Sequence, residues 1–170
     1  MKILETERLI IKTATEEDSQ FFLQLLNSPN WLKFIGNSGI KSEQDAINYI
    51  QSKLINSYKI NGYGLYKMST KNSTPIGICG FVKRDYLDHA DIGFAILPEY
   101  EGNGYTYEAC IELIKYGKTK LNLTPILAIT SPENIKSCHL LNKIGLHQIG
   151  KVQPNKTSTE LLLFSNETNN

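Results

Sequence analysis

A polar pair at helical spacing is the part of this sequence best suited to chemistry. Asn134 and Ser137 lie three residues apart in the segment SPENIKSCHLLNKIGL, so on a helix their amide and hydroxyl groups face the same place. Ser131 can cap the start of that helix, Pro132 suits its first position, and Gly145 can end it in a left-handed conformation. The segment therefore predicts a short helix that presents an amide and a hydroxyl near its beginning.

A glycine-rich turn upstream could bind an anion. The segment DIGFAILPEYEGNGYTYEA, residues 91–109, is typical of an apolar strand, a turn marked by proline, a Gly-x-Gly loop and the start of a helix. Gly102 and Gly104 allow positive φ and close approach of the backbone. The helix that follows offers unpaired N–H donors and a partial positive charge at its N-terminus. The two features together predict an anion-binding loop.

The rest of the chain supplies elements that could position these two segments. Period-2 and apolar runs predict strands over 9–13, 64–69, 76–83, 90–97, 125–130, 146–152 and 159–164. Helical spacing and capping residues predict helices over 15–27, 42–60, 104–120 and 132–143. The stretch NWLKFIGNSGIK has no clear period and is expected to be a loop. A mixed sheet with helices on both faces is the simplest packing of this order.

The pattern N-x-x-S-x-x-L-L-x-K-x-G-[FL], after the glycine loop, resembles the last motif of the GCN5-related N-acetyltransferases. It is most similar to the branch that modifies the amino termini of ribosomal proteins. The resemblance covers residues 5–165 and implies a single domain over 1–170. It implies an α+β fold with a central, mostly antiparallel mixed sheet of about six to seven strands, flanked by helices on both faces. The tail, residues 165–170, is expected to be frayed.

The resemblance also implies acetyl-coenzyme A (acetyl-CoA) as cosubstrate, a primary amine as acceptor, and no metal. A backbone N–H near Ile96 would hold the carbonyl oxygen, Ser137 would protonate the departing thiolate, and Asn134 would orient the pantetheine arm or a water. Leu141 stands where many relatives have a tyrosine, so that version of the acid is absent. The cofactor contacts implied are Ile96, Leu97, Gly102, Asn103, Gly104, Tyr105, Thr106, Asn134 and Lys143. Lys143 also suits a helix C-terminus, where a cation complements the dipole.

The group that accepts the amine proton stays open. Asp91 shares one strand face with Gly93 and Ala95, where small residues could leave room for substrate, and an acid at this place also resembles the family. Asp91 could equally be a solvated residue at the start of a strand. His89 and Asp85 on the preceding turn are alternatives, and water could suffice for an α-amino group with a pKa of about 8.

Two loop positions differ from the form usual in the family, Arg/Gln-x-x-Gly-x-Gly/Ala. Glu101 puts a carboxylate at the first position, which within about 6 Å of a phosphate would cost on the order of 1 kcal/mol. Thr106 is branched where a small residue is usual, although its hydroxyl could donate to a phosphate. Because the main donors are backbone groups, cofactor binding is expected to survive with lower affinity.

The acceptor site is the least defined part of the sequence. Trp31 and Phe34 lie in the irregular stretch and could either line this site or pack in the core. The resemblance favours a protein amino terminus as acceptor, while polyamines, amino sugars and amino acids remain open. The alternative function is a non-catalytic domain of the same fold that binds coenzyme A or a partner protein.

Charge and cysteine content narrow the function further. Lys and Arg total 18 against 17 Asp and Glu, so no global basic field suggests binding to nucleic acid or to an anionic membrane. Three widely spaced cysteines favour reduced thiols and a cytoplasmic location. No apolar run approaches the ~20 residues that span a bilayer. The strand near 159–164 could be an exposed edge that pairs in a homodimer.

Overall fold

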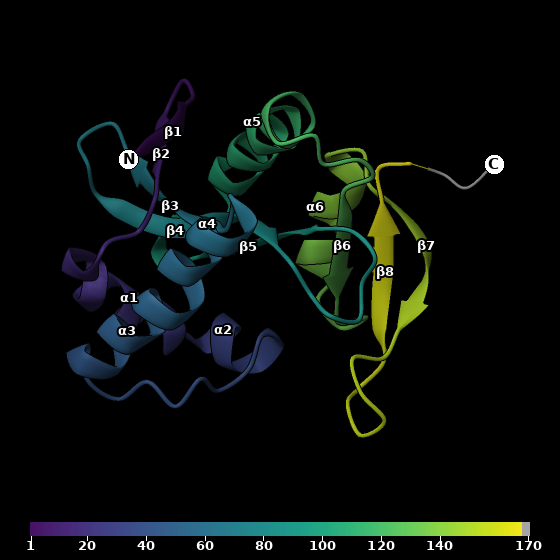
Figure 1. Ribbon diagram of the computed structural model, residues 1–170, viewed down its shortest axis with the longest axis horizontal. Helices are drawn as coiled ribbons and strands as arrows, with labels where there is room; N and C mark the ends of the chain where they lie inside the picture. Colours follow the sequence, from purple (N-terminus) through teal and green to yellow (C-terminus); the bar gives the residue numbers. More distant parts are fainter. Residues whose placement is uncertain (168–170) are drawn as a thin grey trace.

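The computed structural model describes residues 1–167, which form one eight-stranded sheet (Figure 1). The strands are β1 (Lys2–Glu5), β2 (Leu9–Lys12), β3 (Leu65–Thr70), β4 (Pro75–Val82), β5 (Asp91–Ile96), β6 (Leu127–Thr130), β7 (His147–Val152) and β8 (Leu161–Ser165). Their order is β1-β2-β3-β4-β5-β6-β8-β7, and only β5 and β6 are parallel. The predicted α+β fold is confirmed, with one strand more than expected because β1 also pairs with β2.

Helical segments join the strands. They are η1 (Glu16–Asp18), α1 (Ser19–Leu26), α2 (Pro29–Phe34), α3 (Glu43–Tyr49), η2 (Ile50–Ile55), α4 (Asn56–Asn61), η3 (Pro98–Tyr100), α5 (Tyr105–Lys120) and α6 (Ile135–Lys143). The helix predicted over 42–60 is one continuous helical run whose middle part, η2, is a π-helix. The prediction of a loop around Trp31 is wrong for its first half, which belongs to α2. Pro29 is the first residue of this helix, where the backbone N–H has no partner within the helix, so the missing N–H of proline costs nothing. No helix within 1–167 is long and apolar enough to cross a bilayer.

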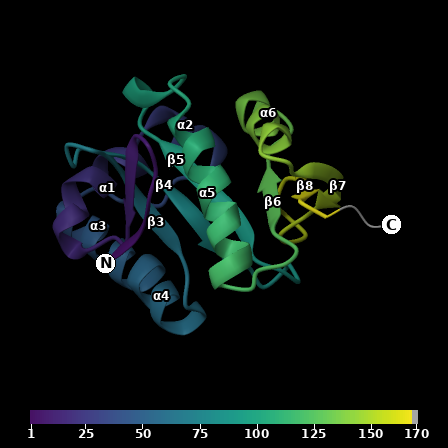
Figure 2. The same cartoon turned by 90° about the horizontal axis from the view of Figure 1, so that it is seen from above.

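Helices cover both faces of the sheet (Figure 2). On one face α5 packs against β2, β4 and β5, and α6 packs against β6 and β7. Gly117 of α5 permits this contact, because a Cβ there would lie 2.6 Å from Cζ of Phe81. On the other face α1, α2 and α3 form a second apolar cluster around Phe22 and Leu25, which reaches the sheet at Ile78. Two cores therefore hold the central strands between them.

The sheet divides at the parallel pair. β5 and β6 share a single pairing position, Asp91 with Leu127, and then diverge toward their carboxyl ends. The glycine turn and α5 follow the carboxyl end of β5, and α6 follows that of β6 (Figure 1). Because both strands run in the same direction, the two predicted motifs lie at the same end of the sheet, on opposite sides of the divergence. One wall of the divergence is formed by β5, the glycine turn and α5, and the other wall is formed by β6 and α6.

The predicted edge strand is wrong. β8 lies between β6 and β7 and pairs with both, so the edges of the sheet are β1 and β7. The homodimer suggested from an edge at 159–164 therefore loses its basis. Ser165, the first residue of the expected frayed tail, belongs to β8. Residues 168–170 of that tail lie outside the described residues.

Candidate functional site

The turn after β5 is shaped to receive an anion. Gly102 and Gly104 adopt left-handed φ angles of +76° and +78°, and Gly104 is the N-cap of α5. The free N–H groups of the helix start therefore lie directly behind the turn. A Cβ at Gly102 would meet nothing within 4 Å, so the turn is open. The Asn103 amide fixes the turn by donating to the carbonyl groups of Tyr100 and Glu101, at 3.2 and 3.1 Å. This arrangement fits a phosphate group.

The residues on either side of the turn hold the predicted positions. Tyr105 and Thr106 are the first two residues of α5. Ile96 ends β5, and the N–H of Leu97 donates to the carbonyl of Ile76 in β4 at 2.8 Å. Because successive residues of a strand direct their backbone groups to opposite edges, the Ile96 N–H points toward β6. β6 has already separated from β5 there, so this N–H faces the divergence.

Glu101 is held by two partners. Its carboxylate accepts from the Asn30 amide on α2 and from Lys136 Nζ on α6, the latter at 2.7 Å. The Glu101 side chain is 21% exposed, whereas that of Lys136 is 84% exposed. From the sequence, the Glu101 carboxylate is expected to repel a phosphate. In the structure Lys136 lies beside this carboxylate and compensates its charge. Glu101 thereby links the glycine turn to both α2 and α6.

The Asn–Ser helix begins later than expected. Asn134, not Ser131, is the N-cap: its Oδ1 accepts from the Ser137 N–H at 3.2 Å. The predicted cap and first helical position are wrong because residues 132–133 form a turn. Asn134 and Ser137 nevertheless lie in the same helical turn, as their spacing predicts. Within residues 1–167, Asn134 Nδ2 and Ser137 Oγ make no hydrogen bond, so both can serve a ligand. Leu141 is in the core.

Lys143 forms a second contact between the walls. Its Nζ lies 4.6 Å from the ring centroid of Tyr107, in the first turn of α5. Such a cation–π contact at an exposed position contributes about 0.5–1 kcal/mol. Lys143 is also the last residue of α6, as its alternative role at a helix C-terminus requires. Lys143 and Lys136 therefore both connect α6 to the wall that carries the glycine turn.

Asp91 lies where β5 and β6 part. Its side chain is 1% exposed, so the alternative of a solvated residue is wrong. Its Oδ1 accepts from Arg84 Nε at 2.9 Å. Burial raises the pKa of Asp91 above its ordinary value, while the Arg84 guanidinium opposes that shift. Burial and then the Asp91 charge also raise the pKa of Tyr63. Asp91 is thus a paired, buried carboxyl group at the vertex of the divergence.

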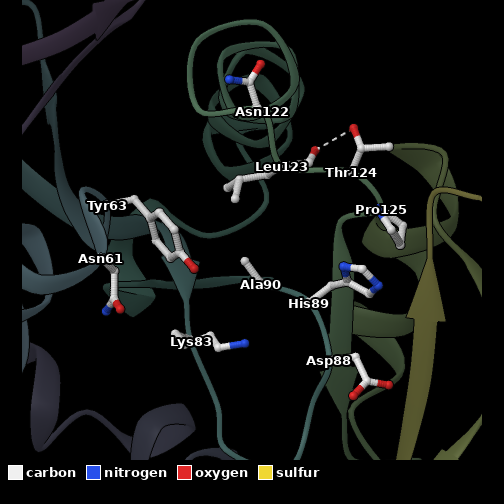
Figure 3. Close-up of a pocket in the computed structure, with 10 residues that line it drawn as sticks. All are labelled: Asn61, Tyr63, Lys83, Asp88, His89, Ala90, Asn122, Leu123, Thr124 and Pro125. Carbon is white, nitrogen blue, oxygen red and sulfur yellow. Dashed lines mark hydrogen bonds between the residues drawn. The ribbon is translucent and has the colours of Figure 1, made fainter.

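The alternative bases lie further away. Asp85 and His89 belong to the loop between β4 and β5, and both are exposed. His89 lines an open hollow together with Tyr63 and Leu123, and the Tyr63 hydroxyl points into it (Figure 3). This hollow is at the amino-terminal end of β5, whereas the glycine turn and the Asn–Ser helix are at the opposite end of the sheet. The structure brings neither His89 nor Asp91, the first residue of β5, directly to those motifs.

The two aromatic residues of α2 differ in their surroundings. Trp31 is 5% exposed and packs in the apolar cluster of α1 and α3. Its Nε1 has no hydrogen-bond partner within residues 1–167. Phe34 is half-buried, with Lys33 Nζ 4.9 Å from its ring centroid. Phe34 is therefore the more accessible of the two, and Asn30 places their helix beside the glycine turn.

Arg8 is a residue of this site that sequence reasoning missed. It lies directly before β2, yet its side chain contacts the glycine turn and Glu108 in the first turn of α5. Its partners are 95 and 100 residues away in the chain, so no local pattern reveals them. The two arginines of the sequence are Arg8 and Arg84, and each pairs with a carboxylate near β5 or α5.

These features define a class of protein in which two strands of a mixed sheet diverge. A glycine turn and free helix N–H groups suited to an anion lie on one side of the divergence, and an amide and a hydroxyl lie on the other. The family model for the acetyltransferase (GNAT) domain matches residues 8–147. The chain belongs to the GNAT acetyltransferase family and is an acyltransferase that depends on acetyl-CoA.

Relatives and solved structures agree with this assignment. The chain is 32% identical to an uncharacterized N-acetyltransferase, p20, from Bacillus licheniformis, over 88% of this chain and 85% of that protein. It is 30% identical to the uncharacterized N-acetyltransferase YoaA from Bacillus subtilis, over 87% and 84%. RimL, a ribosomal L7/L12 alpha-N-protein acetyltransferase solved in complex with coenzyme A, has the same fold, with a TM-score of 0.82, 16% identity and 97% of both chains covered.

Proposed function

We propose that this chain moves the acetyl group of acetyl-CoA directly to a primary amine in a ternary complex. The observation that supports this most is the placement of Asn134 and Ser137 on the wall that faces the glycine turn. The N–H groups behind Gly104 would hold the phosphates of the cofactor, which supplies the activated acetyl group. Asn134 would orient the pantetheine arm through its Nδ2, since its Oδ1 caps α6.

Two groups would serve the reacting atoms. The Ile96 N–H, directed into the divergence, would donate to the thioester carbonyl oxygen as negative charge develops on it. The amine nitrogen forms the new bond to the carbonyl carbon, the carbon–sulfur bond breaks, and Ser137 Oγ would give its proton to the departing thiolate. Ser137 would then recover a proton from the solvent. The chemistry requires no covalent intermediate with the protein.

The proton released by the amine has two routes. Asp91 lies at the vertex of the divergence and burial favours its proton-binding form, but the Arg84 guanidinium competes for the same carboxylate. Asp91 is also the first residue of β5, roughly 16 Å along the strand from Ile96, so it would act as a base only through a rearranged bond to Arg84 and a chain of waters. Water alone is the second route, and it suffices for an amine with a pKa of about 8. The pKa of the acceptor decides between them.

A protein amino terminus is the favoured acceptor. RimL, which shares the fold, is by its description an alpha-N-protein acetyltransferase. An α-amino group also has a lower pKa than a lysine or polyamine amine, which suits a site whose buried carboxyl group is already paired. Small amines are the second acceptor class. Phe34 and the rest of α2, linked to the turn through Asn30 and Glu101, would border the acceptor.

A non-catalytic domain that binds coenzyme A or a partner protein is the competing function. The carboxylate at Glu101 and the apolar Leu141, which stands in place of an acidic hydroxyl, favour it. The free Ser137 hydroxyl on the facing wall favours the enzyme, because a binding domain needs no proton donor there.

Calorimetric titration with acetyl-CoA, followed by an assay of thiol release, tests the proposal. We expect micromolar binding and release of coenzyme A with a peptide that has a free amino terminus, faster than with spermidine or glucosamine. The same peptide with an acetylated amino terminus is the control and should release none. Binding without release from any acceptor would favour the non-catalytic domain. No binding up to millimolar concentration would overturn the enzyme and favour a non-catalytic domain that binds a partner protein.

A further inference from the structure

We propose that Arg8 is a positioning residue that holds the phosphate-binding turn in its anion-receiving conformation. This inference rests on the proposed use of the turn to bind acetyl-CoA. Arg8 comes from the amino-terminal end of the chain, outside the strand, turn and helix that form the phosphate site. Arg8 would thus stabilise the conformation of the turn through contacts that residues of the turn itself do not supply.

One arginine side chain contacts three consecutive parts of this wall. Its Nη1 donates to the carbonyl oxygen of Asn103 at 2.9 Å, and its Nε donates to Oε2 of Glu108 at 2.6 Å. Its guanidinium carbon lies 4.7 Å from the ring centroid of Tyr105. The backbone N–H of Arg8 also donates to Oε1 of Glu108, at 2.8 Å. The turn, the first helical residue and the first-turn carboxylate are therefore fixed to the start of β2 together.

The bond to the Asn103 carbonyl sets the direction of a phosphate donor. The carbonyl of Asn103 and the N–H of Gly104 belong to one trans peptide unit, in which the two groups point in opposite directions. When Arg8 holds this carbonyl on its own side, the Gly104 N–H points away from Arg8. Arg8 Nη2 also lies 3.4 Å from the position a Cβ of Gly104 would take, so the guanidinium covers one side of this glycine. The opposite side is left for the anion.

Arg8 also balances a charge that would oppose the cofactor. Glu108 lies in the first turn of α5, where phosphates would bind. Burial alone would raise the pKa of Glu108, but bonds from the Thr6 hydroxyl and from Arg8 outweigh it and lower the pKa, so this carboxyl group is charged at neutral pH. The guanidinium compensates that charge. Arg8 therefore has two effects: it compensates the Glu108 charge, and it donates a hydrogen bond to the Asn103 carbonyl. The two can be separated, because a substitution that neutralises Glu108 leaves Asn103 unchanged.

The test is calorimetric titration of variants with acetyl-CoA, together with steady-state kinetics. We expect Arg8→Gln to raise the Kd and the KM for acetyl-CoA about 10-fold, as loss of a charge-assisted bond implies, with kcat at saturation changed less than about 2-fold. Arg8→Lys keeps the charge without the planar fork and should raise the Kd about 3-fold. The double variant Arg8→Gln/Glu108→Gln should stay weak, because the Asn103 carbonyl still lacks its donor.

Lys71→Gln is the matched control, because Lys71 is as exposed as Arg8 and pairs with Glu5 of β1 from the turn that follows β3, away from the glycine turn. Its Kd should equal that of the unmodified protein. An Arg8→Lys Kd within experimental error of the unmodified value, with Arg8→Gln equally tight, would overturn the inference. Full recovery in the double variant would overturn it as well, since Arg8 would then only compensate Glu108. If the unmodified protein binds no acetyl-CoA, the proposed function falls first.

Discussion

The two walls of the divergence are held in different ways. On the wall of β5 and α5, Arg8 and Glu108 are joined by two hydrogen bonds, and the Glu108 side chain is only 17% exposed. On the wall of β6 and α6, the contact with the glycine turn is a single hydrogen bond from Lys136, whose side chain is almost entirely in solvent. The Arg8–Glu108 pair is joined by more than one directed hydrogen bond, although the Arg8 side chain is itself 44% exposed. A single exposed ion pair contributes about 0–1 kcal/mol and is screened by salt.

The difference separates two tasks. The wall that would bind phosphates is fixed before any cofactor arrives, which keeps the entropic cost of binding low. The wall that carries Asn134 and Ser137 is tied to it by contacts that a cofactor can replace, since phosphates would compete with Glu101 for Lys136. Substitutions of the glycine turn and of Arg8 should therefore change mainly affinity, whereas a substitution of Ser137 should change mainly turnover.

The largest effect is expected at the turn itself. Gly104→Val places a branched side chain at φ +78° and a Cβ 3.4 Å from Arg8 Nη2, so the turn must change conformation. Acetyl-CoA binding measured by calorimetry should weaken more than about 100-fold. Gly150→Val is the control, because a Cβ at Gly150 meets nothing within 4 Å on the outer strand β7. Retained binding by Gly104→Val would mean that the phosphates bind elsewhere.

The opposite wall should show the converse result. Ser137→Ala removes the proposed proton donor but leaves the N-cap bond, which uses the backbone N–H of residue 137. We expect kcat to fall roughly 100-fold with the Kd for acetyl-CoA nearly unchanged. Ser137→Thr retains the hydroxyl and should recover much of the rate. If Ser137→Ala instead lowers affinity and spares turnover, the division of tasks between the walls is incorrect.

The exposed link between the walls should matter less. Lys136→Gln leaves the Glu101 carboxylate without its cation and should weaken acetyl-CoA binding about 2- to 5-fold at low salt. Glu101→Gln should strengthen binding by a similar factor, and both effects should shrink as the salt concentration rises. Measurement of Kd at two ionic strengths checks this. An effect of Lys136→Gln as large as that of Arg8→Gln would contradict the proposed difference between the walls.

How far the sequence predicts this site depends on the distance between partners in the chain. The Gly-x-Gly turn and the Asn–Ser pair are local patterns, and both are present where their spacing predicts them. Arg8 was missed because its partners lie about a hundred residues away and its own surroundings resemble an ordinary strand start. Pairing across the sheet is equally non-local, which is why the sequence suggests an edge near 159–164 although this strand pairs on both sides.

Short elements and burial were the other limits of sequence reasoning. α2 is one of the shortest helices and begins with proline, so its period is too brief to recognise. The alternation of β5 correctly puts Asp91 on one face with Gly93, but a strand pattern does not tell that this face is covered at Asp91 and that Arg84 pairs with it. The charge state and accessibility of that carboxyl group follow only from the packed structure.

The smallest effect expected is on stability in acid, and it compares the tight carboxylate with an exposed one. The pKa of Glu108 is lower in the folded protein, so this group adds stability above its unfolded pKa, and that stability disappears as the pH falls through the folded pKa. From about pH 5 to about pH 3, the melting temperature of the unmodified protein should fall more steeply than that of Glu108→Gln. Glu160→Gln, which removes an exposed partner of Lys151, should follow the unmodified protein. Parallel curves for Glu108→Gln and the unmodified protein would show that the Arg8 pair is no tighter than a surface ion pair, and the phosphate-binding wall would then be no more fixed than the wall it faces.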